Sequence, residues 1–546
     1  MNRWAEHFKD VLNKEHPSCN DHGKLDLELN IEGSDEDENS EMPTYEEVEE
    51  SIQKLKNGRA PGEDNITLEM IKYGGKQLAK ILHELTCAIW KEEQMPVDWE
   101  TGIICPIFKK GDKLDCNNYR GITLLDIAYK VFSNILNERL KKITENLLGE
   151  YQCGFRKNRS TSDQIFIIRQ MIEKHYEHNQ DLHMLFVDFK QAFDSTERYK
   201  LYQVMEDTKI PHKLIRLVKM TMKNTTARVK VANKLSNSFT FNAGVRQGDG
   251  LSTTLFILAL HYGVQKIDQR GTIFTKLSQI CAYADDIVIV ARTQKKLTEV
   301  YLDLEAETSK LGMEINEKKT KYMVTSTYEH RRNAGDLRIG NKTFETVQSF
   351  QYLGNVTSNT NNNNKCIKER IMLGNKAYYA NRHLFNSSLI SRNSKLQIYR
   401  TLVRPVVTYG SESWTLTVKE ERALAVFERK ILRKIYGPVK ENELWRIRQN
   451  DELEAIIKGE NIVRFIKCQR IRWLGHVERM QDTAIPKKML YGKLYATRRR
   501  GRPKMRWLDD VSMDLRKMGV KDWRDRARHR EDWRHIVAEA KAHPGL

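Results

Sequence analysis

Two adjacent aspartates, Asp285 and Asp286, lie between apolar residues in the stretch ICAYADDIVIV, positions 280–290. Like charges in an apolar setting repel each other, and burying them costs free energy. Side chains of a straight strand alternate between its two faces, so adjacent aspartates can share one site only at a turn. The stretch therefore predicts a β-hairpin with the two carboxylates near its tip. An Asp-Asp turn that faces water is the alternative interpretation.

A third aspartate, Asp188, directly follows the apolar run HMLFV at 183–187, which predicts a buried strand. Mg²⁺ prefers oxygen ligands and usually takes one or two protein carboxylates together with substrate phosphates. Two such ions clamped by carboxylates are the usual apparatus for in-line phosphoryl transfer. A strand-end aspartate combined with a carboxylate hairpin therefore predicts a divalent metal site.

The elements that would position these aspartates indicate an α+β protein. Thr44 and Glu47 form a capping-box pattern at the start of a helix with one apolar stripe, Val48, Ile52 and Leu55. Strands separated by long helical connections are typical of α+β architecture. The predicted strands include 102–108 and 183–187, the predicted helices are 123–146, 161–178 and 251–268, and the chain past about 366, beyond an asparagine run at 361–364, is predicted to be mostly helical.

The composition favours a globular protein with a polyanionic partner. The chain has 546 residues and a net charge of +19, and a field this positive attracts phosphate backbones. Hydrophobic residues make up 40% and no apolar run approaches the roughly 20 residues that span a bilayer, so we expect no membrane segment. The eight cysteines include no C-x-x-C pair, which favours a reducing compartment.

Three segments around the aspartates occur in a characteristic order: FVDFKQAFD at 186–194, GVRQGDGLS at 244–252 and YADD at 283–286. This order resembles motifs A, B and C of reverse transcriptases, in the spelling of non-LTR (LINE-type) retrotransposons. Further matching segments are RAPG at 59–62, NYRGITLL at 118–125, QCGFRKNRST at 152–161, GMEINEKKT at 312–320 and FQYLG at 350–354. The tail also resembles that of insect-type endonuclease–reverse transcriptase elements.

The resemblance implies a right-hand polymerase of fingers, palm and thumb, with an RRM-like antiparallel palm sheet and a mostly helical, basic C-terminal region. The implied domains are an acidic linker or N-terminal tail at 1–43, fingers and a template-contacting region at 44–180, a palm with motifs A to E at 181–360, a helical thumb at 361–440 and a basic nucleic-acid-binding region at 441–546. The first residues, WAEHF at 4–8, look helical, as the end of a preceding structure would.

The implied activity is RNA-directed DNA polymerisation. Asp188, Asp285 and Asp286 would be the catalytic residues and, together with the backbone carbonyl of Phe189, would bind two Mg²⁺ ions, with Mn²⁺ as the alternative metal.

The resemblance also implies residues that bind the incoming nucleotide, namely Lys109, Arg120, Phe193, Gln247, Gly248 and Lys319. Phe193 would block the 2′-hydroxyl of a ribonucleotide and Lys319 would protonate the leaving pyrophosphate. The alternatives are a core position for Phe193 and exposed turns for Lys109 and Lys319.

Contacts to template and primer are implied for Arg156, Arg159, Leu353 and Gly354. The two arginines would bind template phosphates or else face water. Leu353 and Gly354 match the turn that grips the primer.

The chain departs from the family at two places. It has Asp249-Gly250 where Cys-Pro is common, and Gly121 where Pro is common. Asp249 would bring a negative charge near the triphosphate, which predicts a weaker affinity for nucleotides.

The tail contains RRRGRPK at 498–504. Its core resembles an AT-hook that would place Arg500, Arg502 and Lys504 in a narrow minor groove. A nuclear localisation signal and a solvated basic loop are the alternatives. Trp507, Trp523 and Trp533 are predicted to pack in a helical core rather than to stack on bases.

The implied partners are template RNA, primer DNA and deoxynucleotides, in target-primed reverse transcription in the nucleus, with cytoplasm as a second location. Such elements usually encode an upstream endonuclease, which this chain lacks, so a separate or missing nuclease is expected to supply the primer. The competing function is a catalytically inactive or domesticated nucleic-acid-binding protein. The sequence does not indicate an oligomeric state.

Overall fold

The computed structural model describes residues 2–13, 41–232, 234–246, 248–267, 272–497 and 506–546. The chain forms two compact units whose segments alternate along the sequence. Unit 1 comprises Met1–Lys157, Asp188–Asp268 and Val300–Asn316, and unit 2 comprises Asn158–Val187, Gln269–Glu299 and Glu317–Leu546. Across the described residues, no helix is both long enough and apolar enough to cross a membrane.

Unit 1 contains a mixed sheet in the order β2-β1-β4-β5, with β6 also paired to β4. The central strand β1 is antiparallel to β2 and parallel to β4. The bounds are β1 Thr101–Phe108, β2 Tyr119–Leu124, β4 Thr226–Val231, β5 Lys234–Leu235 and β6 Phe239–Thr240.

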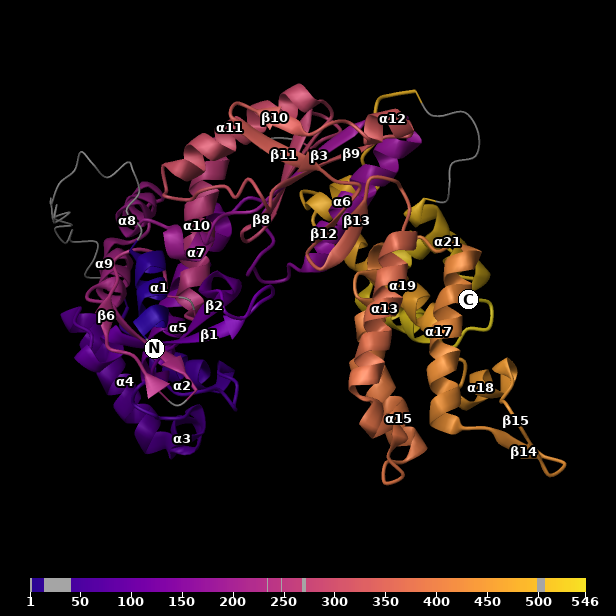
Figure 1. The fold of residues 1–546 in the computed structure, drawn as a ribbon, viewed down its shortest axis with the longest axis horizontal. Helices are drawn as coiled ribbons and strands as arrows, with labels where there is room; N and C mark the ends of the chain where they lie inside the picture. The colour runs from indigo at the N-terminus through magenta and orange to yellow at the C-terminus, as the bar shows by residue number, and fades with distance from the viewer. Residues whose placement is uncertain (1, 14–40, 233, 247, 268–271, 498–505) are drawn as a thin grey trace. The chain divides into compact units, whose positions relative to one another are not determined.

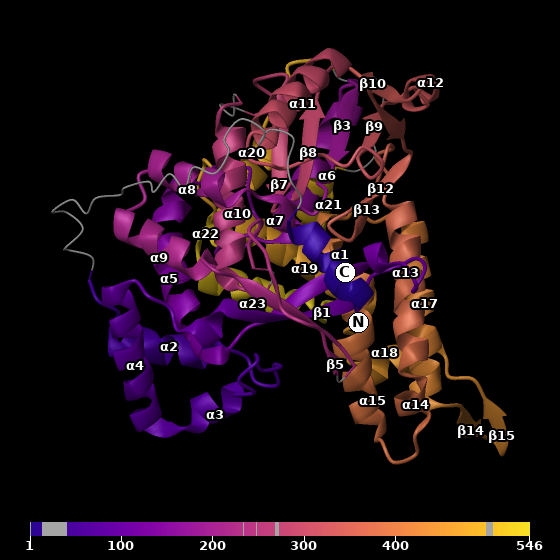
Figure 2. The same cartoon turned by 60° about the vertical axis from the view of Figure 1, so that its left-hand side comes forward.

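Helices surround this sheet in unit 1 (Figure 1). They include α1 Asn2–Leu12, α2 Tyr45–Lys54, α3 Leu68–Tyr73, α4 Gly75–Glu92, α5 Ile127–Leu147, α7 Ala192–Ser195, α8 Arg198–Asp207, α9 His212–Met222 and α10 Gly250–Gln265. The helices α2, α3 and α4 gather at one corner of the unit (Figure 2), and their buried residues form one apolar cluster with α5. The helix α10, which contains no Asp, Glu, Lys or Arg, packs against α5.

Unit 2 contains a six-stranded sheet in the order β10-β11-β9-β3-β8-β7. The strand β3 lies between β8 and β9 and is antiparallel to both, and β11 and β9 are the parallel pair. The bounds are β3 Leu182–Val187, β7 Ser278–Tyr283, β8 Asp286–Ala291, β9 Lys321–Thr325, β10 Leu337–Ile339 and β11 Lys342–Thr346.

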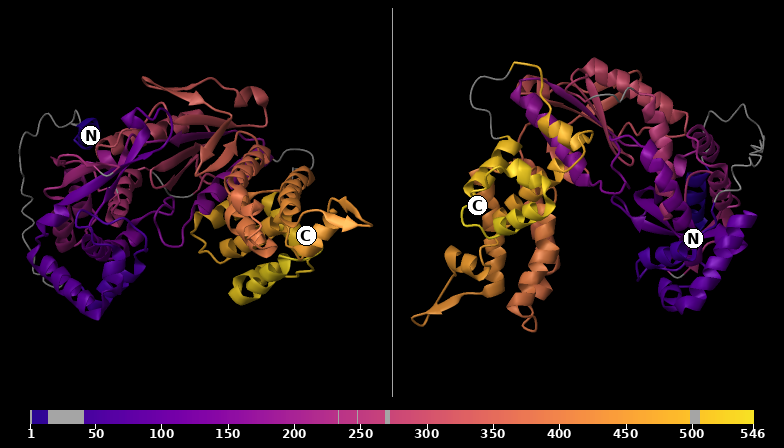
Figure 3. Two further views of the ribbon diagram at one scale, coloured as in Figure 1. Left: turned by 60° about the horizontal axis from the view of Figure 1, so that its bottom comes forward. Right: turned by 180° about the vertical axis from the view of Figure 1, so that it is seen from behind.

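Two separate hairpins and a set of helices complete unit 2. The hairpins are β12 Ser349–Tyr352 with β13 Asn355–Ser358, and β14 Val439–Glu441 with β15 Leu444–Arg446. The longer helices are α6 Thr161–Glu177, α13 Asn364–Ala380, α17 Val418–Tyr436, α19 Ile462–Glu478, α21 Trp507–Lys517 and α23 Arg530–Ala540, and α11 Gln294–Ser309 has residues in both units. The short helix α20 (Ile485–Tyr491) packs along α6, and the right panel of Figure 3 shows this side of the chain from behind.

The structure confirms the α+β class and most of the predicted elements. The capping box at Thr44 and Glu47 forms, with hydrogen bonds of 3.0 and 3.2 Å, and Val48 and Ile52 are buried. The predicted helix 123–146 is wrong at its start, because β2 continues to Leu124 and α5 begins at Ile127.

The helix predicted at 4–8 is confirmed, and its packing against unit 1 is a feature that the linker interpretation of 1–43 did not include. Asn2–Leu12 form α1, which buries Phe8 and Leu12 against the sheet of unit 1. The apolar side chains of this helix are the physical reason, since they gain free energy by burial. The predicted boundaries of fingers, palm and thumb stay predictions.

Candidate active site

The predicted carboxylate hairpin forms in unit 2. Strands β7 and β8 pair in a register that ends with Tyr283 opposite Asp286, so Ala284 and Asp285 make a two-residue turn. Ala284 is buried and adopts a φ of 56°, in the left-handed region that residues other than glycine rarely occupy. Asp285 is half-buried at the tip and Asp286 is exposed at the start of β8. The hairpin prediction is therefore confirmed.

The helix α6 is hydrogen-bonded to the backbone of this hairpin. Its fully buried Gln164 donates a hydrogen bond from Nε2 to the carbonyl of Ala282, at 3.2 Å. The helix begins at a capping box made by Ser160 and Asp163, within the predicted motif at 152–161. A rigid helix start thus fixes the backbone two residues before the turn.

Strand β3, which leads to Asp188, is the neighbour of β8. Val187 lies opposite Ile287, and Asp188 is the next residue of the chain, half-buried and assigned to unit 1. Within unit 1, the carbonyl of Asp188 accepts a hydrogen bond from the N–H of Asn316, at 2.7 Å.

The residues after Asp188 form a short antiparallel contact within unit 1. Phe189 lies opposite Ile315, and the N–H of Lys190 donates to the carbonyl of Glu314 at 2.8 Å. Backbone groups of successive extended residues point to opposite edges. The carbonyl of Phe189 therefore points away from the 314–316 segment, as a metal-binding carbonyl would have to.

The motif B segment approaches β2 closely. Gly248 has a φ of 123°, and a Cβ placed there would lie 2.3 Å from the carbonyl oxygen of Thr123. The glycine is therefore required by the protein backbone itself, whatever it does for a nucleotide. Just before it, the N–H of Val245 donates to the carbonyl of Phe193 at 3.0 Å, which joins motif B to motif A. Gln247 lies outside the described residues.

Phe193 is half-buried, and its ring lies against that of Phe256 of α10, with centroids 4.4 Å apart and planes tilted by 32°. The contact holds the ring in place. It is compatible with both interpretations, a barrier to ribonucleotides and a packing residue.

Lys109 and Arg120 lie on the β1–β2 ladder. Ile107 is opposite Arg120, and the N–H of Lys109 donates to the carbonyl of Asn118 at 2.9 Å. Alternation then places Lys109, Ile107 and Arg120 on one face, with the two cations as diagonal neighbours. Both cations are exposed, and so is Lys319 in unit 2.

We expected Asp249 to weaken nucleotide affinity by bringing a negative charge near the triphosphate. This reason is wrong, because the carboxylate is bound inside the protein. Its carboxylate is buried and caps α10, accepting hydrogen bonds from the N–H of Leu251 at 3.1 Å and the hydroxyl of Ser133 at 3.0 Å. The other oxygen accepts from Tyr129 at 2.7 Å. The buried donors bind this carboxylate inside the protein.

The expectation that Arg156 faces water or template is also corrected. Its side chain is only 5% exposed and forms an ion pair with Glu145 at 2.8 Å. It also donates to the carbonyls of Gly149 and Gln152, at 2.8 and 3.0 Å. Arg156 braces the loop that follows α5, and Arg159 is half-buried at the start of unit 2.

The predicted primer-grip turn is a tight hairpin in unit 2. Leu353 and Gly354 connect β12 to β13 with φ values of 47° and 71°, as in a type I′ turn. Phe350 of β12 stacks on Phe186 of β3, with ring centroids 4.4 Å apart. The hairpin is therefore packed against the strand that leads to Asp188.

Two residues that the sequence did not reveal hold this turn. Tyr409 donates to the carbonyl of Leu353 at 2.9 Å and shares a hydrogen bond of 3.0 Å with the hydroxyl of Thr161. Arg370 of α13 donates to the carbonyl of Gly354, and its guanidinium lies 4.6 Å from the ring centre of Tyr409. Arg370 follows Gly354 by 16 residues and Tyr409 follows Leu353 by 56 residues, so no local pattern could have indicated them.

The tryptophans of the tail pack as predicted. Trp507 and Trp533 are buried in the cluster that surrounds α19, and Trp523 packs against it. Arg500, Arg502 and Lys504 lie outside the described residues. A tryptophan that we did not single out, Trp445 of β15, is 70% exposed.

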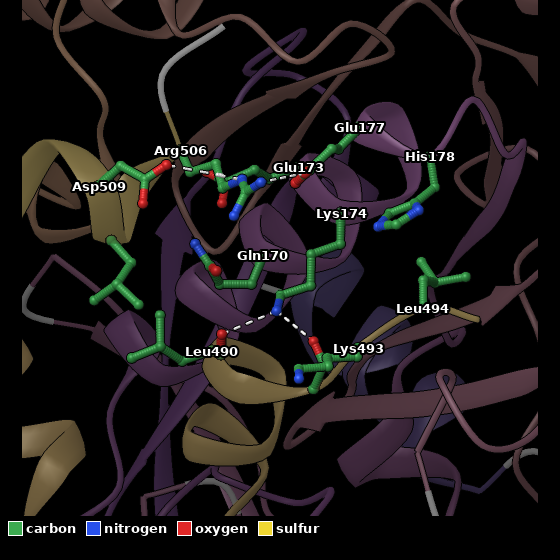
Figure 4. A pocket seen from close by; sticks show the side chains of 12 residues that line it. Gln170, Glu173, Lys174, Glu177, His178, Leu490, Lys493, Leu494, Arg506 and Asp509 are labelled. Carbon is green, nitrogen blue, oxygen red and sulfur yellow. Dashed lines mark hydrogen bonds and ion pairs between the residues drawn. The ribbon is translucent and has the colours of Figure 1, made fainter. Parts of the chain in front are cut away.

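A pocket of about 300 Å³ in unit 2 lies away from the carboxylate hairpin, between α6, the segment after α20, and α21 (Figure 4). Lys174 donates to the carbonyls of Leu490 and Gly492, and Glu173 accepts from the N–H of Trp507 at 2.9 Å. Burial raises the pKa of Glu173 to about 7 and lowers the pKa of Lys174 to about 8. These contacts hold the tail on α6.

The donor set expected for a metal consists of hard oxygens, which fits Mg²⁺ or Mn²⁺. The three aspartates are divided between the two units. Within the part of the chain that the structure describes, no three His, Cys, Asp or Glu side chains are gathered closely enough to hold a metal ion.

Comparison with known proteins identifies the class. Residues 107–356 match the family model for reverse transcriptase (RNA-dependent DNA polymerase). This segment contains β2, the motif A and B segments, the carboxylate hairpin and the first half of β13. This part of the chain, just under half of it, therefore resembles a reverse transcriptase domain.

Two similar proteins come from transposons. The chain is 25% identical over 402 residues to a probable RNA-directed DNA polymerase from transposon X-element of Drosophila melanogaster, covering 72% of this chain and 44% of the relative. It is 24% identical over 433 residues to the RNA-directed DNA polymerase from mobile element jockey of the same species, with the same coverage. Over this length the chain is similar to RNA-directed DNA polymerases of transposons, and it spans less than half the length of these two relatives.

A solved structure of Candida tropicalis telomerase in complex with a TWJ fragment of telomeric RNA is also similar. It is 13% identical and the match covers 76% of this chain and 68% of that chain, with a TM-score of 0.38.

Proposed function

We propose that this chain is an RNA-directed DNA polymerase that acts in target-primed reverse transcription of a non-LTR element. The observation that carries the proposal is the Asp285 turn, placed at the end of the β7–β8 hairpin beside the strand that leads to Asp188. This arrangement lies within the segment that matches the reverse transcriptase family.

Asp188, Asp285 and Asp286 act together in the proposed site. Val187 is fixed opposite Ile287, and a single peptide bond connects Val187 to Asp188. When bound, two divalent cations would activate the primer 3′-hydroxyl and neutralise charge on the phosphates. The chain supplies oxygen ligands through the carboxylates and the Phe189 carbonyl, and no basic side chain is needed among these ligands.

The elements of unit 1 would bind the incoming deoxynucleotide. Lys109 and Arg120, on one face of the β1–β2 ladder, would hold the triphosphate with charge-assisted hydrogen bonds. Phe193, held by Phe256, would exclude a 2′-hydroxyl. The primer 3′-hydroxyl would release its proton to solvent water as it attacks the α-phosphate, and pyrophosphate would leave, with Lys319 of unit 2 as the proton donor to the leaving group.

Unit 2 would hold the primer. The braced turn at Leu353 and Gly354 is rigid, and it packs on β3 through Phe350. A fixed turn can present backbone groups to a primer strand without losing conformational entropy on binding. We further propose template RNA and primer DNA as partners, and a nuclear location supported by the basic segment at 498–504.

Primer extension on poly(rA)/oligo(dT) with Mg²⁺ tests the proposal, with Asp285→Ala as the matched inactive variant. We expect the variant to lose on the order of 10⁴-fold or more in rate, as other enzymes do when a catalytic residue is removed. If the unaltered chain makes no more product than Asp285→Ala, the polymerase proposal fails. Retained binding of the primer–template in that case would favour the inactive nucleic-acid-binding protein.

A further inference from the structure

The N-terminal helix α1 carries one apolar stripe. Trp4, Phe8 and Leu12 are spaced four residues apart, which places them on one face of a helix. The opposite face is charged, and Glu6, Lys9 and Asp10 are exposed. This pattern is typical of a helix that binds in a groove through a row of anchors.

The groove lies on the sheet of unit 1, where α1 is seen against β6 and β2 in Figure 1. Phe8 and Leu12 are buried in one cluster, and the ring of Trp4 meets that of Tyr119 edge-on at 4.8 Å. The sheet and the segment after it contribute Ile104, Ala227, Val229 and Phe241 to the cluster. A cavity of about 30 Å³ is left beneath the helix, which is room for little more than one water molecule.

Gly121 shapes the groove for Phe8. A Cβ at this position would lie 2.7 Å from Cε1 of Phe8 and 2.9 Å from Cγ2 of Ile104. Any larger residue would therefore displace the ring. The close packing of α1 on β2 therefore explains why this chain has glycine at position 121, where relatives often have proline.

The C-terminal end of α1 is hydrogen-bonded to the segment 240–243, which directly precedes motif B. The N–H of Ala243 donates to the carbonyl of Leu12 at 3.3 Å. Asn13 donates to the carbonyl of Thr240 at 3.1 Å and accepts from the N–H of Asn242 at 3.2 Å. The next residue after this segment is Gly244, which begins motif B.

The helix thus joins two elements of the proposed nucleotide site. On β2 it contacts Gly121, next to Arg120, and at its end it holds the residues that enter motif B. The buried residues of α1 belong to a different apolar cluster from those of α2 to α5, so the helix can leave its groove without breaking the packing of α2 to α5.

We propose that α1 is a detachable clamp that fixes β2 and motif B in the arrangement that binds a deoxynucleotide. Its groove is a binding site for an amphipathic helix with aromatic or aliphatic anchors at positions i, i+4 and i+8. This inference rests on the proposed polymerase function, but the groove itself can be tested without activity.

The first test measures occupancy of the groove in the full chain. In a Trp4→Ala/Phe8→Ala variant, a fluorescently labelled peptide of residues 2–13 should bind, and the unaltered chain should bind it much more weakly because its own helix competes. Gly121→Leu added to the double variant should abolish peptide binding. Equal binding to all three proteins, or to none, overturns the clamp.

The second test is a double-mutant cycle on thermal unfolding. Gly121→Ala should lower Tm by itself, because its Cβ meets the ring of Phe8. In a Phe8→Ala background the same change should lower Tm less, because the ring is gone. Additive effects would show that the helix is not seated on Gly121, and this result does not depend on polymerase activity.

The third test concerns nucleotide binding. Phe8→Ala should raise the KM for deoxynucleotide about fivefold or more with kcat nearly unchanged, because apparent affinity falls with the fraction of clamped molecules. Lys9→Ala, on the exposed face of the same helix, should leave KM unchanged, and excess peptide should restore the KM of the Trp4→Ala/Phe8→Ala variant. An unchanged or lower KM for Phe8→Ala overturns the proposal. If no protein is active but the peptide still binds, the polymerase proposal fails and the groove stands.

Discussion

The hairpins β7–β8 and β12–β13 of unit 2 both reverse the chain in two residues, but they use these residues in different ways. At the first turn the side chain of Asp285 is the feature of interest, and the backbone carries a left-handed alanine. At the second turn the backbone is the feature of interest, and Arg370 and Tyr409 bind both of its carbonyls. Where the side chains of a turn are functional, the supporting hydrogen bond is made to the strand before the turn, at Ala282. Where the backbone of the turn is functional, the supporting hydrogen bonds are made to the turn residues themselves.

Both hairpins rest on α6. Gln164 supports the backbone of β7, and Thr161 shares a hydrogen bond with Tyr409. A change that loosens α6 should therefore affect both turns, while changes at one turn should leave the other intact. The following predictions use this difference, from the largest expected effect to the smallest.

The largest effect is expected from Glu173 of α6. Burial raises its pKa from 4.5 to about 7. The unfolded chain therefore releases its proton at lower pH than the folded chain does, and this group lowers stability as pH rises from about 4.5 to 7. The full cost, about 3 kcal/mol for a shift of this size, is reached above pH 7.

Glu173→Gln should remove this cost while still accepting the hydrogen bond of the Trp507 N–H. The Tm of the variant minus that of the unaltered chain should grow between pH 5 and 7 and then level off. His175 titrates in the opposite sense, since burial lowers its pKa to about 4, so only the difference between the two proteins is informative. A difference that stays constant with pH would contradict the prediction.

The next effect concerns the backbone of the second turn. Gly354→Ala should destabilise unit 2 by about 1–2 kcal/mol, because an L-residue is strained in the left-handed region. The new Cβ would be 3.8 Å from Tyr409, an ordinary contact, so the cost is conformational. Denaturant unfolding measures it, and Gly335→Ala, where no atom lies within 4 Å and no positive φ is found, is the control. Equal losses in both variants would mean that the turn is not special.

Tyr409 supports the second turn through a single group, its hydroxyl, which donates a hydrogen bond to the carbonyl of Leu353. Tyr409→Phe should weaken primer binding by about 2- to 10-fold, which corresponds to roughly 0.5–1.5 kcal/mol. The rate at saturating primer should stay the same, since the β7–β8 hairpin keeps its own support from Gln164. Tyr379→Phe, at an exposed tyrosine of α13, is the matched control. A loss of kcat without a change in primer affinity would break the distinction between the two turns.

The smallest effect is expected at the first turn. Ala284→Gly relieves the left-handed strain of about 1–2 kcal/mol but adds about 0.5–1 kcal/mol of chain entropy. The net result should be a gain of roughly 0.5 kcal/mol with primer extension retained, opposite in sign to Gly354→Ala. Calorimetric unfolding of the two variants side by side checks the sign. A destabilised Ala284→Gly would show that the alanine methyl group packs more than the strain costs.

Short-range patterns predicted much of the fold correctly. The capping box at Thr44, the strand before Asp188, the helix at 161–178 and the YADD hairpin depend on residues close together in the chain. The start of α5 was not predicted correctly because the short, mostly apolar segment ITLL at 122–125 is compatible with either a strand or a helix. The helix at 4–8 was predicted, but its place on the sheet of unit 1 was not, because a short amphipathic segment shows no partner until the groove has formed.

The sequence by itself determined the family that the chain resembles and the candidate chemistry, because ordered motifs and hard oxygen donors are properties of residue type and spacing. The tertiary structure decided which charged groups are used internally. It turned Asp249 to cap α10 and Arg156 to pair with Glu145, and it brought Arg370 and Tyr409 to a turn far away in the chain. The physical reason is that burial and hydrogen-bond partners come from segments distant in sequence, so a side chain's role depends on what the fold places around it.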